Sequence, residues 1–265
     1  MIRVLEHAAG GVGASPQAAA LAGRVVLVAG AAGGLGRASA LACAKAGATV
    51  VLLGRTVRAL EKVYDGIEAV GGARPAIYPL DLAGASPRDH AELADAIVAQ
   101  CGRLDGLVHA AAHFSGLQPF DEQAPEEWLR CLHVNATAPY LLTQACLPAL
   151  RERDDAAVVF VLDDPARVGK AFWGGYGAAK HAVAGLASIV HEETETGPVR
   201  MHALLPAPMR TRLRREAYFG EDTLGIEPPD RAGEAVAWLL TPQAREWRGR
   251  VLDLRPPSTA TGQGN

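Results

Sequence analysis

Short, unbroken apolar runs alternate along this chain with longer stretches in which apolar residues recur every third or fourth position. The runs are rich in β-branched residues and predict strands buried on both faces of a parallel sheet. These strands are Val25–Ala29, Thr49–Leu53, Ala76–Leu80, Leu107–Ala111, Ala157–Leu162, Val199–Leu205 and Val251–Leu254. The periodic stretches predict helices, over Leu35–Ala46, Val57–Val70, Arg88–Gln100, Pro125–Arg151, Gly175–Thr194 and Arg231–Leu240.

Regular alternation of strands and helices predicts one doubly wound α/β domain over residues 23–255. We expect about seven parallel strands, with helices on both faces. A chain of 265 residues that is 49% hydrophobic can bury one large core. Residues 1–22 are expected to form a loose leader and the polar residues 256–265 a flexible tail. The longest break, residues 206–230, is interpreted as a lid over a substrate.

Charge and cysteine content exclude several classes of function. A net charge of −3 favours neither nucleic acid nor an anionic membrane as a partner. No apolar run approaches the roughly 20 residues needed to span a bilayer. The cysteines, Cys43, Cys101, Cys131 and Cys146, form no C-x-x-C pair, so neither a metal site nor a disulfide framework is expected. Free thiols suit a cytoplasmic location.

A glycine-rich turn follows the first predicted strand and opens the first predicted helix. Gly30 permits the tight turn, Gly34 lets a pyrophosphate approach the backbone, and Gly36 allows close packing of helix on sheet. Backbone N–H groups and the helix dipole converge there, which favours phosphate binding. The spacing is G-x-x-x-G-x-G, and glycines also occur in ordinary strand–helix turns.

Tyr176 and Lys180 lie four residues apart, on one face of a predicted helix. A phenol with a pKa near 10 exchanges protons poorly at neutral pH, but a nearby ammonium group lowers that pKa. The pair therefore suits general acid–base catalysis. A bare Y-x-x-x-K is also common on helix surfaces.

The order of these motifs resembles the short-chain dehydrogenase/reductase family from about Leu21 to Arg255. The family's TGxxxGIG appears as Ala29-Gly30 through Gly34-Leu35-Gly36, and its Asp-Leu pair as Asp81-Leu82. Its helical asparagine appears as Asn135, its Y-x-x-x-K as Tyr176 and Lys180, and its Pro-Gly with a later Thr as Pro206-Ala207 and Thr211. The motif sequences are similar to those of a bacterial branch of the family that includes proteins labelled oxoacyl-carrier-protein reductases.

The resemblance implies a Rossmann fold that exchanges a hydride between a nicotinamide cofactor and a carbonyl or alcohol. Tyr176 would donate or accept the proton, Lys180 would bind the ribose, and Asn135 would distort its helix and hold a water. The implied cofactor-binding residues are Gly30, Gly34, Leu35, Gly36, Asp81, Leu82, Ala111, Tyr176, Lys180, Pro206 and Thr211. Family members usually assemble as homodimers or homotetramers.

After the second predicted strand, Gly54 stands where an acidic residue would hydrogen-bond the ribose hydroxyls of NAD, and Arg55 follows it. An arginine offers a charge-assisted fork for the 2′-phosphate of NADP. The sequence therefore favours NADP over NAD, with a solvated surface arginine as the alternative interpretation.

Asp163 stands where the family has its catalytic serine, and no Ser or Thr occurs between Arg151 and Tyr176. An ionised aspartate accepts hydrogen bonds only. At ~4 Å and an effective dielectric of ~20 it would oppose a tyrosinate by about 4 kcal/mol. Either Asp163 is protonated and donates, or it turns toward Lys170 or Arg167.

Other positions also depart from the family pattern. Ala29 replaces a threonine, His109-Ala-Ala-Ala112 replaces Asn-Asn-Ala-Gly, and Ala207 replaces a glycine. His113 faces substrate or is a half-buried loop histidine. The lid arginines, Arg210, Arg212, Arg214 and Arg215, either attract an anionic substrate such as an acyl thioester or are solvated.

Two functions follow from this pattern. The first is an NADP-dependent oxidoreductase acting on a small-molecule carbonyl or secondary alcohol, with Asp163 in place of serine. The alternative is a nucleotide-binding or scaffold protein with an impaired site.

Overall fold

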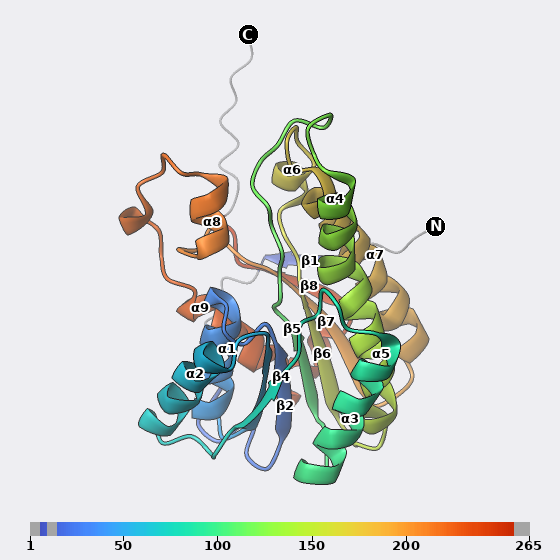
Figure 1. Cartoon of the computed structure of the whole chain (residues 1–265). Helices are drawn as coiled ribbons and strands as arrows, with labels where there is room; N and C mark the ends of the chain where they lie inside the picture. The colour runs from blue at the N-terminus through green and yellow to red at the C-terminus, as the bar shows by residue number, and fades with distance from the viewer. Residues whose placement is uncertain (1–5, 10–14, 257–265) are drawn as a thin grey trace.

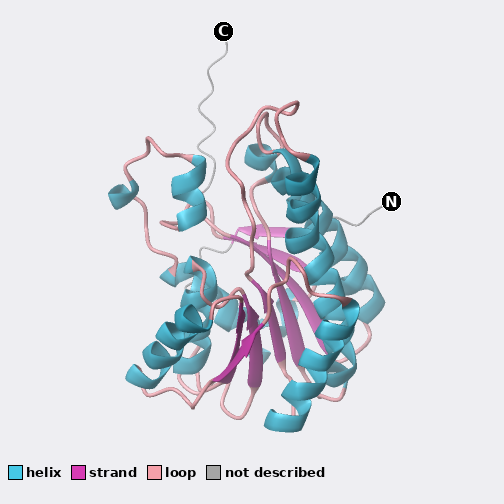
Figure 2. Cartoon of the chain, viewed as in Figure 1, coloured by secondary structure: helices cyan, strands magenta, loops and turns pink. Residues whose placement is uncertain are grey.

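An eight-stranded, fully parallel sheet forms the centre of the molecule (Figures 1 and 2). The computed structural model describes residues 6–9 and 15–256. The spatial order of the strands is β1-β8-β7-β6-β5-β2-β3-β4. Their bounds are Glu6–Ala9 (β1), Val25–Ala29 (β2), Thr49–Gly54 (β3), Ala76–Pro79 (β4), Gly106–His109 (β5), Ala156–Val161 (β6), Val199–Leu205 (β7) and Arg250–Asp253 (β8).

Helices cover both faces of this sheet. One face carries α1 (Gly34–Lys45), α2 (Val57–Ala69) and α9 (Asp230–Leu239), and the other carries α3 (Pro87–Cys101), α5 (Ala138–Arg151) and α7 (Gly174–Thr194) (Figure 1). Shorter helices are α4 (Pro125–Leu132), α6 (Pro165–Val168) and α8 (Arg212–Ala217), with 3₁₀ turns at Thr223–Gly225 and Pro242–Trp247.

Strand β2 shows why the apolar runs predict the sheet correctly. All five of its residues are buried. Val26 and Val28 pack into the core beneath α1 and α9, whereas Leu27 packs into the core beneath α5 and α7. Side chains alternate between the faces of a strand, so a strand covered on both sides must be apolar throughout. The predicted doubly wound α/β architecture is confirmed.

The N-terminal segment differs from the loose leader expected over residues 1–22. Residues Glu6–Ala9 form β1, which pairs in parallel with β8 in the register Glu6↔Arg250 to Ala9↔Asp253. This pairing adds the eighth strand. The hydrophobic pattern did not predict β1, because its four residues show no apolar alternation. A short edge strand is held in place by backbone hydrogen bonds, which the pattern does not reveal. The tail expected over residues 256–265 lies, beyond Pro256, outside the described residues.

The long helix predicted over Pro125–Arg151 is interrupted. A π-helical segment, His133–Thr137, separates α4 from α5 without breaking the chain direction. Strand boundaries shift by one or two residues; the strand predicted to end at Ala111 ends at His109. The expected lid contains α8, which Thr211 caps by accepting a hydrogen bond from the Arg214 amide.

Two negative findings apply to the described part of the chain. No helix there is long and apolar enough to cross a membrane. No group of His, Cys, Asp or Glu side chains among these residues has the arrangement of a metal site, and the four cysteines are free.

The close contact between α1 and α9 depends on Gly233. A Cβ atom at this position would lie 2.5 Å from the Ala38 carbonyl carbon. We therefore expect Gly233→Ala to destabilise the fold by about 1–3 kcal/mol, because two helix backbones would have to separate. Urea unfolding measures the change. The matched control is Gly185→Ala in α7, where nothing lies within 4 Å. That substitution should stabilise by about 0.5–1 kcal/mol, and equal effects of both would contradict the packing described here.

Candidate active site

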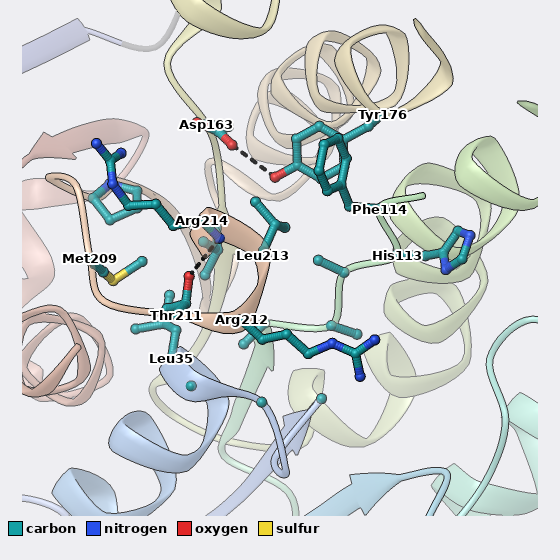
Figure 3. Close-up of a pocket in the computed structure, with 18 of the residues that line it drawn as sticks. Leu35, His113, Phe114, Asp163, Tyr176, Met209, Thr211, Arg212, Leu213 and Arg214 are labelled. Carbon is teal, nitrogen blue, oxygen red and sulfur yellow. Dashed lines mark hydrogen bonds between the residues drawn. The ribbon is translucent and has the colours of Figure 1, made fainter. Parts of the chain in front are cut away.

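A cavity of about 1010 Å³ lies at the carboxyl ends of the strands, between the lid and the loops that follow β5 and β6 (Figure 3). Parallel strands bring all these loops to one edge of the sheet, which is where α/β proteins bind ligands. Nearly all the sequence-predicted site residues line this cavity: Gly30, Gly34, Leu35, Arg55, Asp81, Leu82, Ala111, Asp163, Tyr176, Lys180, Pro206 and Thr211. Gly36 and Asn135 do not line it.

The glycine turn leaves the N-terminus of α1 open to the cavity. Gly30 has a φ of +79°, and a Cβ atom there would lie 2.5 Å from the Ala111 backbone. A Cβ at Gly36 would overlap the Gly30 carbonyl oxygen, and one at Gly34 would touch the Thr211 methyl group. The N-cap residue, Gly33, has no side chain that caps the helix. The first amides of α1 are thus left to bind an anion.

Tyr176 and Lys180 lie one turn apart on α7, and both are buried at the cavity wall. The Tyr176 hydroxyl donates to Oδ2 of Asp163 at 2.8 Å (Figure 3). The Lys180 ammonium donates to the Val161 carbonyl at 2.9 Å and lies 5.8 Å from the Tyr176 ring centroid. Lys180 is therefore held by the end of β6 and does not contact the phenol oxygen.

Asp163 uses both carboxylate oxygens. Its Oδ1 atom accepts a hydrogen bond from the Asp164 amide at 2.7 Å and another from the Arg167 guanidinium. Between the alternatives left by the sequence, the structure therefore favours contact with Arg167. The carboxylate does not turn away from the site, because its other oxygen is bonded to Tyr176.

The electrostatics of Tyr176 differ from the expectation for a phenol beside an ammonium group. Burial raises the pKa of Tyr176 well above its ordinary value, and the charge and hydrogen bond of Asp163 raise it further. The Arg167 charge acts on this pKa in the opposite direction. Burial also lowers the pKa of Lys180. The effect of Asp163 has the direction expected from the sequence, which is opposition to a tyrosinate, and desolvation adds to it.

Asn135 lies in the π-helical segment and ties it to the loop after β5. Its amide oxygen accepts from the His113 amide at 2.9 Å, and its amide nitrogen donates to the carbonyls of His113 and Cys131 at 2.8 and 2.9 Å. The His113 ring is bonded to Glu127 at 2.9 Å. His113 thus has a carboxylate partner, and the predicted relay role of Asn135 stays a prediction.

His109 occupies the end of β5, where the family pattern has asparagine. Its ring stacks on Phe160 with centroids 4.8 Å apart, and Nε2 lies 2.8 Å from the Thr143 hydroxyl. Burial lowers the pKa of His109 to about 3, so the ring is neutral at working pH. It ties β5 to α5 by a single side-chain contact.

Ion pairs neutralise two of the lid arginines. Arg212 binds Glu216 at 2.7 Å, and Arg214 binds Glu221 through two nitrogens at 2.7 and 2.6 Å. These contacts disfavour the interpretation that both cations receive an anionic substrate.

Aromatic residues near the site were missed by the sequence reasoning. Phe114 packs edge-on against Tyr176 with centroids 5.3 Å apart, and Trp173 lies 5.8 Å from the same ring. Tyr218, from the end of α8, lies 6.3 Å from Trp173. They come from three separate loops, so no periodicity groups them. The only signal was the position of Trp173 three residues before Tyr176.

Known proteins resemble this chain over most of its length. The family model described as short chain dehydrogenase matches residues 24–221. The uncharacterized oxidoreductase YciK of Escherichia coli K12 is 34% identical over 233 residues, covering 88% of this chain and 92% of YciK. A structure from Escherichia coli CFT073 in complex with NADPH is 34% identical, with a TM-score of 0.86, and covers 91% of this chain and 100% of that chain. One from Shigella flexneri 2a in complex with NADP is 33% identical, with a TM-score of 0.85 and coverage of 89% and 99%.

Removal of the Asn135 side chain should loosen the contact between the π-helical segment and the His113 loop. Asn135→Ala leaves the His113 amide and two carbonyls without these partners. We expect a loss of about 2–3 kcal/mol in the free energy of unfolding, measured by urea denaturation. Gln144→Ala, which removes an exposed bond to Tyr140, is the control and should change stability by less than about 0.5 kcal/mol. Equal stability of the two variants would show that the Asn135 bonds contribute little.

Proposed function

We propose that this chain, which belongs to the short chain dehydrogenase family, is an NADP-dependent oxidoreductase that acts on a carbonyl or a secondary alcohol. The observation that carries the proposal is the placement of Tyr176, Lys180 and Asp163 on one wall of the cavity, with the phenol bonded to the carboxylate. Fold resemblance alone would not assign chemistry, because function depends on the site.

The cavity fits a dinucleotide at its glycine-rich end. Gly34 faces Thr211 with space that a Cβ would fill, and the α1 amides are uncapped. Arg55, exposed at the end of β3, has no ion-pair partner among residues 6–9 and 15–256. A free guanidinium there suits a 2′-phosphate. The complexes of the two similar proteins with NADP and NADPH support the same choice.

NADP, when bound, supplies or accepts the hydride. The chain itself handles the proton. Because the Tyr176 hydroxyl donates to Asp163, the phenol oxygen keeps lone pairs that can accept a hydrogen bond from a substrate hydroxyl. In alcohol oxidation the substrate proton passes to the Tyr176 oxygen as the phenol proton passes to the Asp163 carboxylate. Carbonyl reduction runs through the same two atoms in reverse.

The raised pKa of Tyr176 favours a second candidate, a protein that binds NADP(H) without turnover. A phenol whose pKa is raised keeps its proton at neutral pH unless the carboxylate accepts it. If Asp163 does not fill that role, the cavity retains cofactor binding alone. Both candidate functions include binding of NADP(H), and only the first includes hydride transfer.

The phenol is tested by Tyr176→Phe, which removes the proton-transferring group and keeps the ring. We expect kcat to fall by about 10²–10⁴-fold, followed through NADPH absorbance over a panel of carbonyls, while NADPH affinity changes less than about twofold. Tyr140→Phe, at an exposed position of α5, is the matched control. Turnover that survives in Tyr176→Phe contradicts the proposed role. Tight NADPH binding with no turnover by the unsubstituted chain selects the second candidate.

The cofactor choice is tested by Arg55→Ala. Loss of the guanidinium should weaken NADPH binding by about 10- to 100-fold, because a charge-assisted phosphate contact disappears, and should leave NADH binding unchanged. Tryptophan fluorescence titration measures both affinities. The control is Arg58→Ala, which removes an exposed arginine of α2 that does not line the cavity. Equal losses for NADPH and NADH in Arg55→Ala would reject a role in phosphate recognition.

A further inference from the structure

Arg167 bonds the carboxylate that replaces the family's serine. It lies in α6, four residues after Asp163, and its guanidinium reaches back to Oδ1 of that residue. The Arg167 side chain is 25% exposed and that of Asp163 is 11% exposed, so this ion pair is only partly screened by solvent. Such a pair is stronger than one on an open surface.

The charged and titratable groups that face Asp163 come from two neighbouring helices. α7 contributes the Tyr176 hydroxyl and the Lys180 ammonium, and α6 contributes Arg167. The adjacent Asp164 is paired with Arg255 at 2.8 Å. Because Lys180 donates to the Val161 carbonyl, the direct cationic contact of Asp163 among the described residues is Arg167.

The other side of Arg167 contacts aromatic rings, one of which belongs to the lid. Its guanidinium carbon lies 5.0 Å from the Trp173 ring centroid and 5.9 Å from that of Tyr218. Tyr218 follows α8, and its ring also lies 4.9 Å from the guanidinium carbon of Arg214. The Tyr218 ring thus lies beside two arginines. One is hydrogen-bonded to Asp163, and the other is hydrogen-bonded to Glu221 of the lid.

We propose that Arg167 is a positioning residue, which holds the Asp163 carboxylate in the orientation that accepts the Tyr176 hydroxyl, and that Tyr218 links this contact to the lid. This inference rests on the proposed function, because it assigns Asp163 the acceptor role in proton transfer. Arg167 lines the cavity, and its guanidinium is hydrogen-bonded to Asp163 Oδ1, whereas the phenol is bonded to Oδ2 of the same carboxylate. It acts through Asp163.

Two physical effects follow from this arrangement. The guanidinium supplies a positive charge next to a carboxylate whose other hydrogen-bond donors, the Tyr176 hydroxyl and the Asp164 amide, are neutral. The bond to Oδ1 also fixes the carboxylate plane, so that Oδ2 points at Tyr176. Displacement of Tyr218 with the lid removes a cation–π contact from Arg167 and weakens both effects. The position of the lid would thereby control how well the Asp163 carboxylate is oriented to accept the Tyr176 proton.

The test needs no turnover. In protein labelled with [¹³Cζ]tyrosine, the Tyr176 resonance is assigned by its loss in Tyr176→Phe and recorded by NMR at neutral pH. The Cζ chemical shift of a phenol depends on the hydrogen bond that its hydroxyl donates, so this resonance reports the bond from Tyr176 to Asp163. We expect Arg167→Met to move the resonance toward the position of an unbonded phenol, Arg167→Lys to move it less, and Tyr218→Leu to move it in the same direction by a smaller amount.

Arg88→Met is the matched control, since Arg88 and Glu92 form an exposed ion pair with the same four-residue spacing. The Tyr176 resonance should not move in this variant. An unmoved resonance in Arg167→Met overturns the proposal, and a shift there without any shift in Tyr218→Leu overturns the link to the lid.

Kinetics provide a separate measurement. Arg167→Met should lower kcat by about tenfold at neutral pH with little change in KM for NADPH, and Arg167→Lys should recover part of the loss. Absence of turnover in the unsubstituted chain rejects the proposed oxidoreductase and leaves the chemical shift of Tyr176 as the test of Arg167. Turnover with an unmoved Tyr176 resonance in Arg167→Met rejects the role of Arg167 alone.

Discussion

A carboxylate that is nearly buried beside a phenol needs a positive charge close to it, and this requirement shapes the cavity wall around Tyr176. Burial desolvates the Asp163 carboxylate, and the Tyr176 hydroxyl that donates to it carries no positive charge. Arg167 meets the requirement from a single turn of helix, and rings from α7 and the lid enclose that arginine. One substitution in the family pattern is therefore accompanied by a local set of contacts that fits it.

The sheet and its helices were predictable because their physical cause is local. Strands covered on both faces must be apolar throughout, as β2 and β6 are, and covering helices must present one apolar face. The edge strand β1 was missed because its stability comes from backbone pairing with β8. The π-helical segment lies at Asn135, where the family resemblance implied a distorted helix. Periodicity alone predicted a continuous helix, since it does not reveal the bonds from the Asn135 amide to the carbonyls of His113 and Cys131.

The sequence predicted which residues line the cavity better than it predicted the contacts that they make. Spacing along one helix places Tyr176 and Lys180 together, and parallel strands bring Gly30, Arg55 and Asp163 to one cavity. Spacing does not say which partner each polar atom finds. Lys180 is bonded to the Val161 carbonyl, and the Tyr176 hydroxyl to a carboxylate. These choices depend on burial and on side chains from distant loops, so they appear only in three dimensions.

Pairing of Glu6–Ala9 with β8 has a practical consequence for recombinant production of this protein. A chain truncated beyond residue 9 would leave the outer edge of β8 with unpaired amide and carbonyl groups, and such an edge recruits strands from other molecules. Placement of a fusion tag or a protease site at the start of the chain therefore bears on solubility, even though this segment lies far along the sheet from the glycine-rich turn that follows β2.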